Sequence, residues 1–243
     1  MKTLYLAKEP GLGVRNDLSR LSGEVTIVDC LNGYSDWYKL KGYSCISTNE
    51  FFTNNDMKFT MVIGNPPYGK NSSLAVKFLN RASELSDTVH MVLPKTFRKP
   101  SIINRLNSNL HLVSDVDVDD SAFRDSISAC VQKWEVKEEE RERIKTYTTH
   151  KDFTFCKKSE ADICLGRVGG GPCGKVFDEW ENRSDNSHYF LKVSSPTVIE
   201  NLRSLSKEFR CAGLQTVGCP SLSKDDCVKI YSTHFDNEDT LPC

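Results

Sequence analysis

The sequence has no long apolar segment, no closely spaced cysteine pair and no excess of positive charge. No hydrophobic run approaches the roughly 20 residues that span a bilayer, and Met1 leads into the chain without a signal-peptide pattern. The 32 lysines and arginines are balanced by 33 aspartates and glutamates, which excludes binding to nucleic acid through bulk positive charge. We therefore expect a cytoplasmic protein with no membrane partner, in which any contact with a polyanion uses a local patch.

The ten cysteines are scattered along the chain, and no two have the C-x-x-C spacing of a zinc knuckle or a thioredoxin-like site. The most closely spaced cysteines are not accompanied by histidines that could complete a metal site. This usage is typical of structural thiols in a reducing compartment, and we expect no metal site. The length of 243 residues fits one large domain, or one domain with a small appendage.

The first part of the chain alternates short apolar runs with turn-rich or amphipathic stretches, which is typical of parallel strands joined by crossovers. We expect strands at residues 3–7, 24–30, within 44–52, 58–64, 89–93, 111–116 and 128–136, and helices at 14–21, 74–85 and 102–110. The pattern predicts an α/β fold with a mostly parallel sheet over residues 1–136.

The remaining sequence differs in character. Residues 137–145 are almost all charged and are predicted to be a connector. Residues 146–243 contain a glycine cluster, strand-like pieces at 190–193 and 228–231, and a helical pattern at 197–209. They are therefore predicted to form a small α+β region that follows the connector.

The strongest chemical signal is the string Asn65-Pro66-Pro67-Tyr68, which follows an apolar strand. In open α/β sheets, ligands bind at the carboxyl edge where such a strand ends. Two consecutive prolines fix the backbone and remove both N–H groups, so the carbonyl oxygens remain available as acceptors. The turn is therefore suited to binding a donor such as an exocyclic or amide NH2 group.

This arrangement predicts a way to activate a poor nucleophile. If the Asn65 side-chain oxygen and the Pro66 carbonyl both accept hydrogens of a conjugated amino group, its lone pair is directed at an electrophile. Neither a metal nor a strong base is required. Tyr68 would hold the planar substrate by face stacking, which is worth roughly 1–3 kcal/mol per base in nucleic-acid systems.

The string after its apolar strand resembles the catalytic motif of the S-adenosylmethionine-dependent N6-adenine DNA methyltransferases. The resemblance covers about residues 3–136 and implies a Rossmann-like class I methyltransferase core, with residues 146–243 as the target-recognition region. It implies catalytic roles for Asn65, Pro66, Pro67 and Tyr68. It also implies that the flipped target base stacks on Tyr68 and Phe123.

The same resemblance implies a site for S-adenosylmethionine at the carboxyl ends of the early strands. Its predicted residues are Glu9, Gly11, Gly13, Asp29, Glu50, Phe51 and Asn65. Asp29 is expected to hold the ribose hydroxyls, and the segment with Glu50 and Phe51 to contact the adenine of the cofactor. The glycine turn holds only Gly11 and Gly13 and little sequence precedes the first strand, which leaves open a site completed by a partner subunit.

Positive charge is concentrated near the catalytic string. Residues 68–105 hold seven basic and two acidic side chains. We expect contacts with DNA phosphates from the basic residues nearest the catalytic edge, Lys70, Lys95, Arg98 and Lys99. Arg167 and Lys175, in the later glycine-rich loop, are also expected to contact the duplex, and this loop is expected to select the sequence through base contacts.

The leading hypothesis is methyl transfer to N6 of adenine in DNA, the base being flipped out of the duplex. Two same-chemistry alternatives are methylation of adenine in RNA and of a glutamine amide in a protein. A third alternative, of a different class, is a catalytically silent nucleic-acid-binding subunit or inhibitor. Binding of the cofactor separates this last hypothesis from the others.

Overall fold

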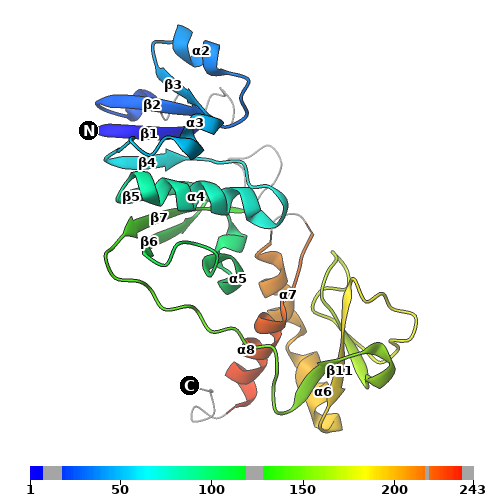
Figure 1. The fold of residues 1–243 in the computed structure, drawn as a ribbon. Coiled ribbons are helices and arrows are strands. Elements are labelled where there is room, and N and C mark those ends of the chain that lie inside the picture. Colours follow the sequence, from blue (N-terminus) through cyan, green and yellow to red (C-terminus); the bar gives the residue numbers. More distant parts are fainter. Residues whose placement is uncertain (8–17, 119–127, 217–218, 237–243) are drawn as a thin grey trace. The chain divides into compact units, whose positions relative to one another are not determined.

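The computed structural model describes residues 1–7, 18–118, 128–216 and 219–236 (Figure 1). The chain divides into two compact units, residues 1–144 and 145–243. Each unit buries its own core.

A seven-stranded sheet forms the centre of the first unit, in the order β3-β2-β1-β4-β5-β7-β6. Its strands are β1 (Lys2–Ala7), β2 (Glu24–Asp29), β3 (Ser44–Ser47), β4 (Met61–Gly64), β5 (Thr88–Pro94), β6 (Leu110–Asp117) and β7 (Ala129–Val136). Neighbouring strands from β3 to β5 pair in parallel, and β7 runs antiparallel to both β5 and β6. This order, with one antiparallel strand inserted beside β5, is that of the class I methyltransferase core. The predicted fold class is therefore confirmed.

Helices cover both faces of this sheet because the apolar residues of its strands alternate in direction. The helices are α2 (Ser35–Leu40), α3 (Thr48–Thr53), α4 (Ser73–Leu85) and α5 (Pro100–Ile103), with 3-10 turns η1 (Lys70–Ser72) and η2 (Lys95–Arg98). On one face, Phe78 and Leu79 of α4 pack against Leu4, Leu6 and the other buried residues of the main core. On the other face, a smaller cluster joins Tyr5 and Ile27 to Tyr38 of α2.

The second unit is built on a four-stranded antiparallel sheet in the order β10-β9-β11-β8. The strands are β8 (Phe153–Cys156), β9 (Ile163–Gly166), β10 (Val176–Phe177) and β11 (His188–Val193). Three helices, α6 (Pro196–Ser204), α7 (Ser206–Leu214) and α8 (Lys224–Phe235), complete its core. Buried Leu191, Phe209 and Tyr231 join the sheet to α7 and α8. A small α+β region was expected here and is confirmed.

Three expected elements were wrong. The strand expected at 228–231 lies within α8, which begins with a capping box in which Ser223 and Asp226 bond reciprocally to each other's backbone N–H. The helix expected at 197–209 is two helices that meet at Leu205, whose φ is −87° and ψ is 9°. The helix expected at 102–110 is the shorter α5, which starts earlier because Pro100 occupies its first turn.

The charged segment after β7 belongs to the first unit through residue 144. Arg141 fixes it there, because its guanidinium donates hydrogen bonds to the carbonyls of Ile103, Leu106 and Leu110. A run of charge that indicates only solvent exposure thus contains one arginine with a defined structural role.

Candidate functional site

The backbone at the end of β4 lies unusually close to β1. Gly64 pairs with Leu6 and has a φ of 145°, and a Cβ built on it would lie 2.3 Å from the Leu6 carbonyl oxygen. Only glycine fits this approach, since any side chain would collide with backbone atoms. The next N–H, that of Asn65, donates to the same Leu6 carbonyl at 3.2 Å. The close approach therefore fixes where the Asn65 side chain leaves the sheet.

The predicted catalytic turn presents unused acceptors. Asn65 is half-buried and Pro66 is buried. Within residues 1–7, 18–118, 128–216 and 219–236, neither the Asn65 side chain nor the Pro66 carbonyl forms a hydrogen bond. Pro66 and Pro67 have no N–H to compete for these oxygens. Two carbonyl-type oxygens at the carboxyl edge of β4 thus remain available to a donor.

Tyr68 is held by its backbone and by its ring. Its carbonyl accepts hydrogen bonds from the N–H groups of Leu74 and Ala75 at 3.1 and 3.2 Å, at the start of α4. Its ring packs against the main core. Burial, with a smaller contribution from the neighbouring Cys130 thiol, raises the pKa of Tyr68 to about 12. The phenol is therefore neutral near pH 7 and offers an uncharged aromatic surface.

The segment between the turn and α4 has a strained backbone. Asn71 and Ser72 have φ values of 51° and 56°, which non-glycine residues rarely adopt. Two long-range contacts hold it in place. Arg105 Nη1 donates to the Asn71 carbonyl at 2.9 Å, and the hydroxyls of Ser72 and Thr96 lie 3.1 Å apart. Spacing in the sequence contains no signal for these contacts, so Arg105, Ser72 and Thr96 were not predicted.

Asp29 lies at the carboxyl end of β2 and is fully buried. Its Oδ2 accepts hydrogen bonds from the Tyr34 N–H at 2.6 Å and the Ser35 hydroxyl at 3.0 Å. Its Oδ1 is buried and has no hydrogen-bond partner among the residues that the structure describes. A buried carboxylate oxygen without a donor is unfavourable, and a ligand hydroxyl would satisfy it. The residue thus fits the expected role of holding a sugar hydroxyl.

Glu50 and Phe51 have structural partners. Glu50 Oε2 accepts from the Ser47 N–H and hydroxyl at 3.0 and 3.1 Å, which completes the capping box of α3. These bonds lower the pKa of Glu50. The Phe51 ring is fully buried and stacks on Phe78, with ring centroids 5.3 Å apart. The Phe51 ring therefore has no exposed surface in this structure, and its expected contact with a cofactor stays a prediction.

Lys95 and Arg98 are paired with acids of β6. Arg98 forms hydrogen-bonded ion pairs with Asp115 at 2.5 Å and Asp117 at 2.6 Å, and Lys95 pairs with Asp117 at 3.1 Å. The Gln132 amide also donates to Asp115 at 2.8 Å. These contacts join the turn after β5 to the end of β6. Lys95 and Arg98 are thus paired with carboxylates in this structure, and their expected contact with phosphates stays a prediction.

The remaining residues that were expected to contact DNA or the cofactor lie in different surroundings. Lys70 and Lys175 are exposed and Lys99 is half-buried. The Arg167 guanidinium lies 5.1 Å from the centre of the Tyr189 ring. Glu9, Gly11, Gly13 and Phe123 lie outside the described residues. The structure thus places Asn65 to Tyr68 and Asp29 at the carboxyl ends of β4 and β2, which flank β1 in one sheet, whereas Arg167 and Lys175 belong to the second unit.

The described part of the chain lacks both a clustered set of metal ligands and a membrane-spanning helix. It contains no group of three or more histidine, cysteine, aspartate or glutamate side chains placed to hold a metal ion. None of its helices combines the length and the apolar character needed to cross a membrane.

Comparison with solved structures finds similarity at the level of the fold. No family model matches the sequence, and no curated protein matches it. Among solved structures, the chain is similar to TrmN from Thermus thermophilus, with 17% identity and a TM-score of 0.43 over 56% of this chain and 44% of TrmN. It is similar to the 23S rRNA methyltransferase ErmE, with 19% identity and a TM-score of 0.39 over 58% of this chain and 63% of ErmE. The N-methyltransferase NodS from Bradyrhizobium japonicum WM9 has 11% identity and a TM-score of 0.44, over 56% of this chain and 86% of NodS.

Proposed function

We propose that the chain transfers a methyl group from S-adenosylmethionine to the exocyclic N6 of adenine in DNA. The observation that carries the proposal is the pair of unused acceptors, Asn65 Oδ1 and the Pro66 carbonyl, at the carboxyl edge of β4. An exocyclic NH2 has two hydrogens to donate, and the turn offers two oxygens. The first unit supplies the catalytic core, and the second unit supplies target recognition.

The residues of the turn, Asn65 to Tyr68, act on the adenine and its amino group. Asn65 and Pro66 each accept one N–H of the adenine amine, which withdraws the nitrogen lone pair from the ring and directs it outward. The neutral Tyr68 ring stacks on the adenine and holds it in position. The strained Asn71–Ser72 backbone, held by Arg105 and Thr96, keeps the turn in this arrangement before substrate binds.

Asp29 is the residue that would hold the methyl donor. Its unpaired, buried Oδ1 accepts a ribose hydroxyl, while Tyr34 and Ser35 keep the carboxylate oriented. When bound, S-adenosylmethionine would supply an electrophilic methyl carbon; as the amine nitrogen forms the new C–N bond, the methyl–sulfur bond would break, the thioether would leave and one N–H proton would pass to solvent. Gly11 and Gly13, or a partner subunit, would complete that site.

The proposal is tested by identifying the methylated product. The protein is incubated with isotope-labelled S-adenosylmethionine in three separate reactions. Each reaction contains one candidate substrate: duplex DNA, structured RNA or glutamine-containing peptides. We expect label in N6-methyladenine of hydrolysed DNA. Label only in RNA adenine or in glutamine would transfer the assignment to that substrate. Binding of the donor without any transfer would favour the silent binding module.

A further inference from the structure

Two cations of the second unit lie against aromatic rings. The Arg167 guanidinium carbon is 5.1 Å from the centre of the Tyr189 ring. The Lys224 ammonium is 4.7 Å from the Phe155 ring and 6.0 Å from the Tyr189 ring. The two rings contact each other edge to face, with centroids 5.1 Å apart. We refer to Arg167, Lys224, Tyr189 and Phe155 as the cation–aromatic cluster.

The backbone fixes the cluster at several points. Arg167 directly follows β9, and its N–H donates to the Ser187 carbonyl at 2.9 Å. Its own carbonyl accepts from the Leu222 N–H at 2.7 Å. The Tyr189 hydroxyl donates to the Leu222 carbonyl at 3.1 Å. Three separate segments of the second unit therefore hold the arginine and the ring that it covers.

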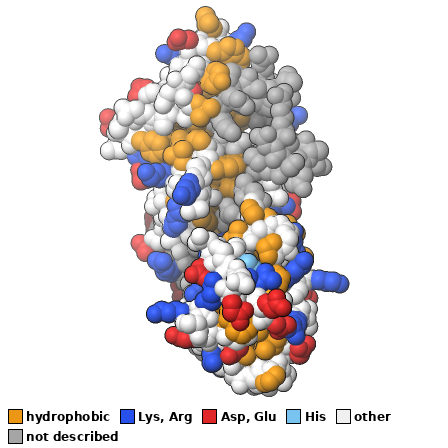
Figure 2. All heavy atoms as spheres, turned by 90° about the vertical axis from the view of Figure 1, so that its right-hand side faces the viewer, with side chains coloured by type: hydrophobic (Ala, Val, Ile, Leu, Met, Phe, Trp, Pro, Cys, Tyr) orange, Lys and Arg blue, Asp and Glu red, His pale blue; other side chains and the backbone are white. Residues whose placement is uncertain are grey.

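The two cations of the cluster have no carboxylate partner among the described residues, unlike several other cations of the unit. On the face of the second unit seen in the lower half of Figure 2, acidic and basic side chains are interspersed. Several are ion pairs, among them Lys151–Asp236, Lys192–Asp162 and Lys229–Asp225. Within the described residues of this unit, neither Arg167 nor Lys224 forms an ion pair.

The nearby carboxylate of Asp226 is already used. It interacts electrostatically with Tyr189, and its Oδ2 accepts from the Ser223 N–H at 2.9 Å in the cap of α8. The Arg167 guanidinium donates to no described residue, and its Nε is buried without an acceptor. The arginine is thus oriented by the ring and lacks the anion that a guanidinium ordinarily binds.

We propose that the cation–aromatic cluster binds the phosphodiester backbone of the nucleic acid on which the proposed methyl transfer acts. The inference rests on that function and names the surface by which the second unit holds its substrate. A guanidinium on an aromatic ring is desolvated on one side and presents its N–H groups in a planar fork that matches a phosphate. Lys224 adds a second positive charge against the same ring.

The cluster positions nucleic acid without reading its sequence. The described cations already lie over Tyr189 and Phe155, so these rings are not offered for base stacking. Phosphate contacts carry no sequence information directly. This changes the expectation for the glycine-rich loop after β9, because Arg167 at its start contacts the backbone of the nucleic acid instead of a base edge.

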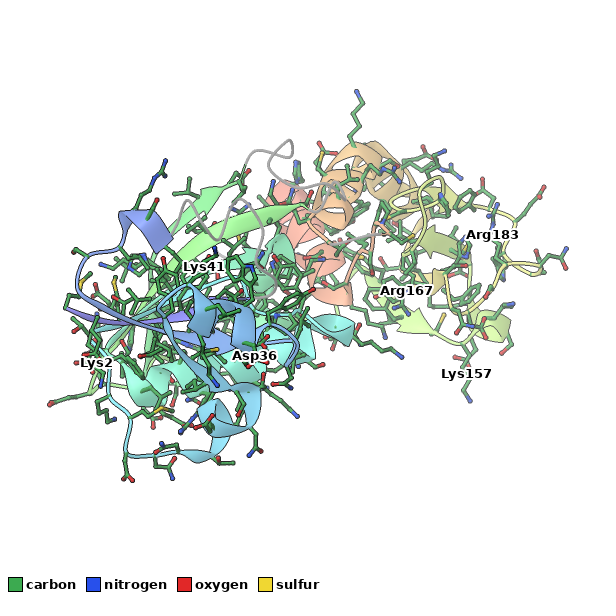
Figure 3. The ribbon with its side chains drawn as sticks, turned by 90° about the horizontal axis from the view of Figure 1, so that it is seen from above. Lys2, Asp36, Lys41, Lys157, Arg167 and Arg183 are labelled. Carbon is green, nitrogen blue, oxygen red and sulfur yellow. The ribbon has the colours of Figure 1, made fainter. Side chains whose placement is uncertain are left out.

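The test is the salt dependence of binding to a fluorescein-labelled DNA duplex, measured by anisotropy. The variant Arg167→Gln/Lys224→Gln removes both charges and keeps side chains of comparable length. Loss of two phosphate contacts should reduce the log–log salt slope by about two and weaken binding about tenfold or more at moderate salt. The matched control, Lys157→Gln/Lys207→Gln, removes the same charge from exposed positions of the unit; Figure 3 labels Lys157 and Arg167. It should retain the wild-type slope.

A second variant separates geometry from charge. Arg167→Lys keeps the positive charge and loses the planar fork, so we expect weaker binding with a nearly unchanged slope. Circular dichroism of each variant checks that the unit remains folded. A wild-type slope in Arg167→Gln/Lys224→Gln would overturn the inference, even if methyl transfer is observed. Failure of the wild-type protein to bind any duplex while it binds S-adenosylmethionine would also overturn it and leave the methyl-donor site intact.

Discussion

Gly64 lies so close to Leu6 that a Cβ on the glycine would meet the leucine carbonyl oxygen at 2.3 Å and its N–H nitrogen at 2.8 Å. The two residues are paired across β1 and β4, at the end of the strand that carries the proposed catalytic turn. One backbone contact therefore sets both the packing of the sheet edge and the starting point of the Asn65 side chain.

Gly64→Ala is expected to lower the free energy of unfolding by about 2–4 kcal/mol, because the substitution combines a backbone collision with a left-handed φ. Urea unfolding measures the change. Gly33→Ala is the matched control, since a Cβ there meets nothing within 4 Å. Equal stability of the two variants would show that the sheet edge can separate without cost.

Asp29→Ala is expected to weaken binding of S-adenosylmethionine by roughly 1–3 kcal/mol, because an acceptor for a ribose hydroxyl is lost. Isothermal titration calorimetry measures the dissociation constant. Ser35→Ala is the control, since it removes one donor to Oδ2 at 3.0 Å and leaves the carboxylate in place. If both variants bind the donor like the wild type, Asp29 has only a structural role.

Arg98→Ala is expected to destabilise the first unit by about 1–3 kcal/mol, because it removes charged hydrogen bonds to Asp115 and Asp117. Burial raises the pKa of Asp115, but hydrogen bonds from Arg98 and Gln132 outweigh it and the pKa is lowered. The pair therefore contributes stability above the unfolded pKa of about 3.9, and that stability is lost as the pH falls through the lower folded pKa.

Unfolding measured from neutral to acid pH should accordingly show a smaller loss of stability for Arg98→Ala than for the wild type. Lys133→Ala is the control, because it removes a single ion pair, with Glu135, whose side chain is more exposed than that of Asp115. If Arg98→Ala instead shows a reduced salt slope for DNA binding and unchanged stability, the result would support a contact between Arg98 and a DNA phosphate.

The sequence allowed the sheet and its edge to be predicted because both follow from short-range patterns. Buried strands appear as apolar runs; Asp29 ends one of them and Asn65 directly follows another. The helical character of α8 was missed, since the apolar residues around Val228 and Tyr231 fit a strand when the Ser223–Asp226 cap is overlooked.

Contacts between distant residues could not be predicted in the same way. Arg98 and Asp115 are 17 residues apart, and Arg81, which donates to the Phe51 carbonyl, is 30 residues from it. Tertiary packing determines which arginine binds a carboxylate or a carbonyl and which remains available to a phosphate. For that reason, a cluster of basic residues near the site included two that are neutralised within the fold.

The most direct test of the account is methyl transfer by Asn65→Ala. With labelled S-adenosylmethionine and duplex DNA, we expect the wild type to form N6-methyladenine and the variant to be slower by about 10²–10³, because one of two acceptors on the amine is lost. Donor affinity and the unfolding transition should remain close to those of the wild type. Near-full activity of Asn65→Ala would contradict the proposed mechanism.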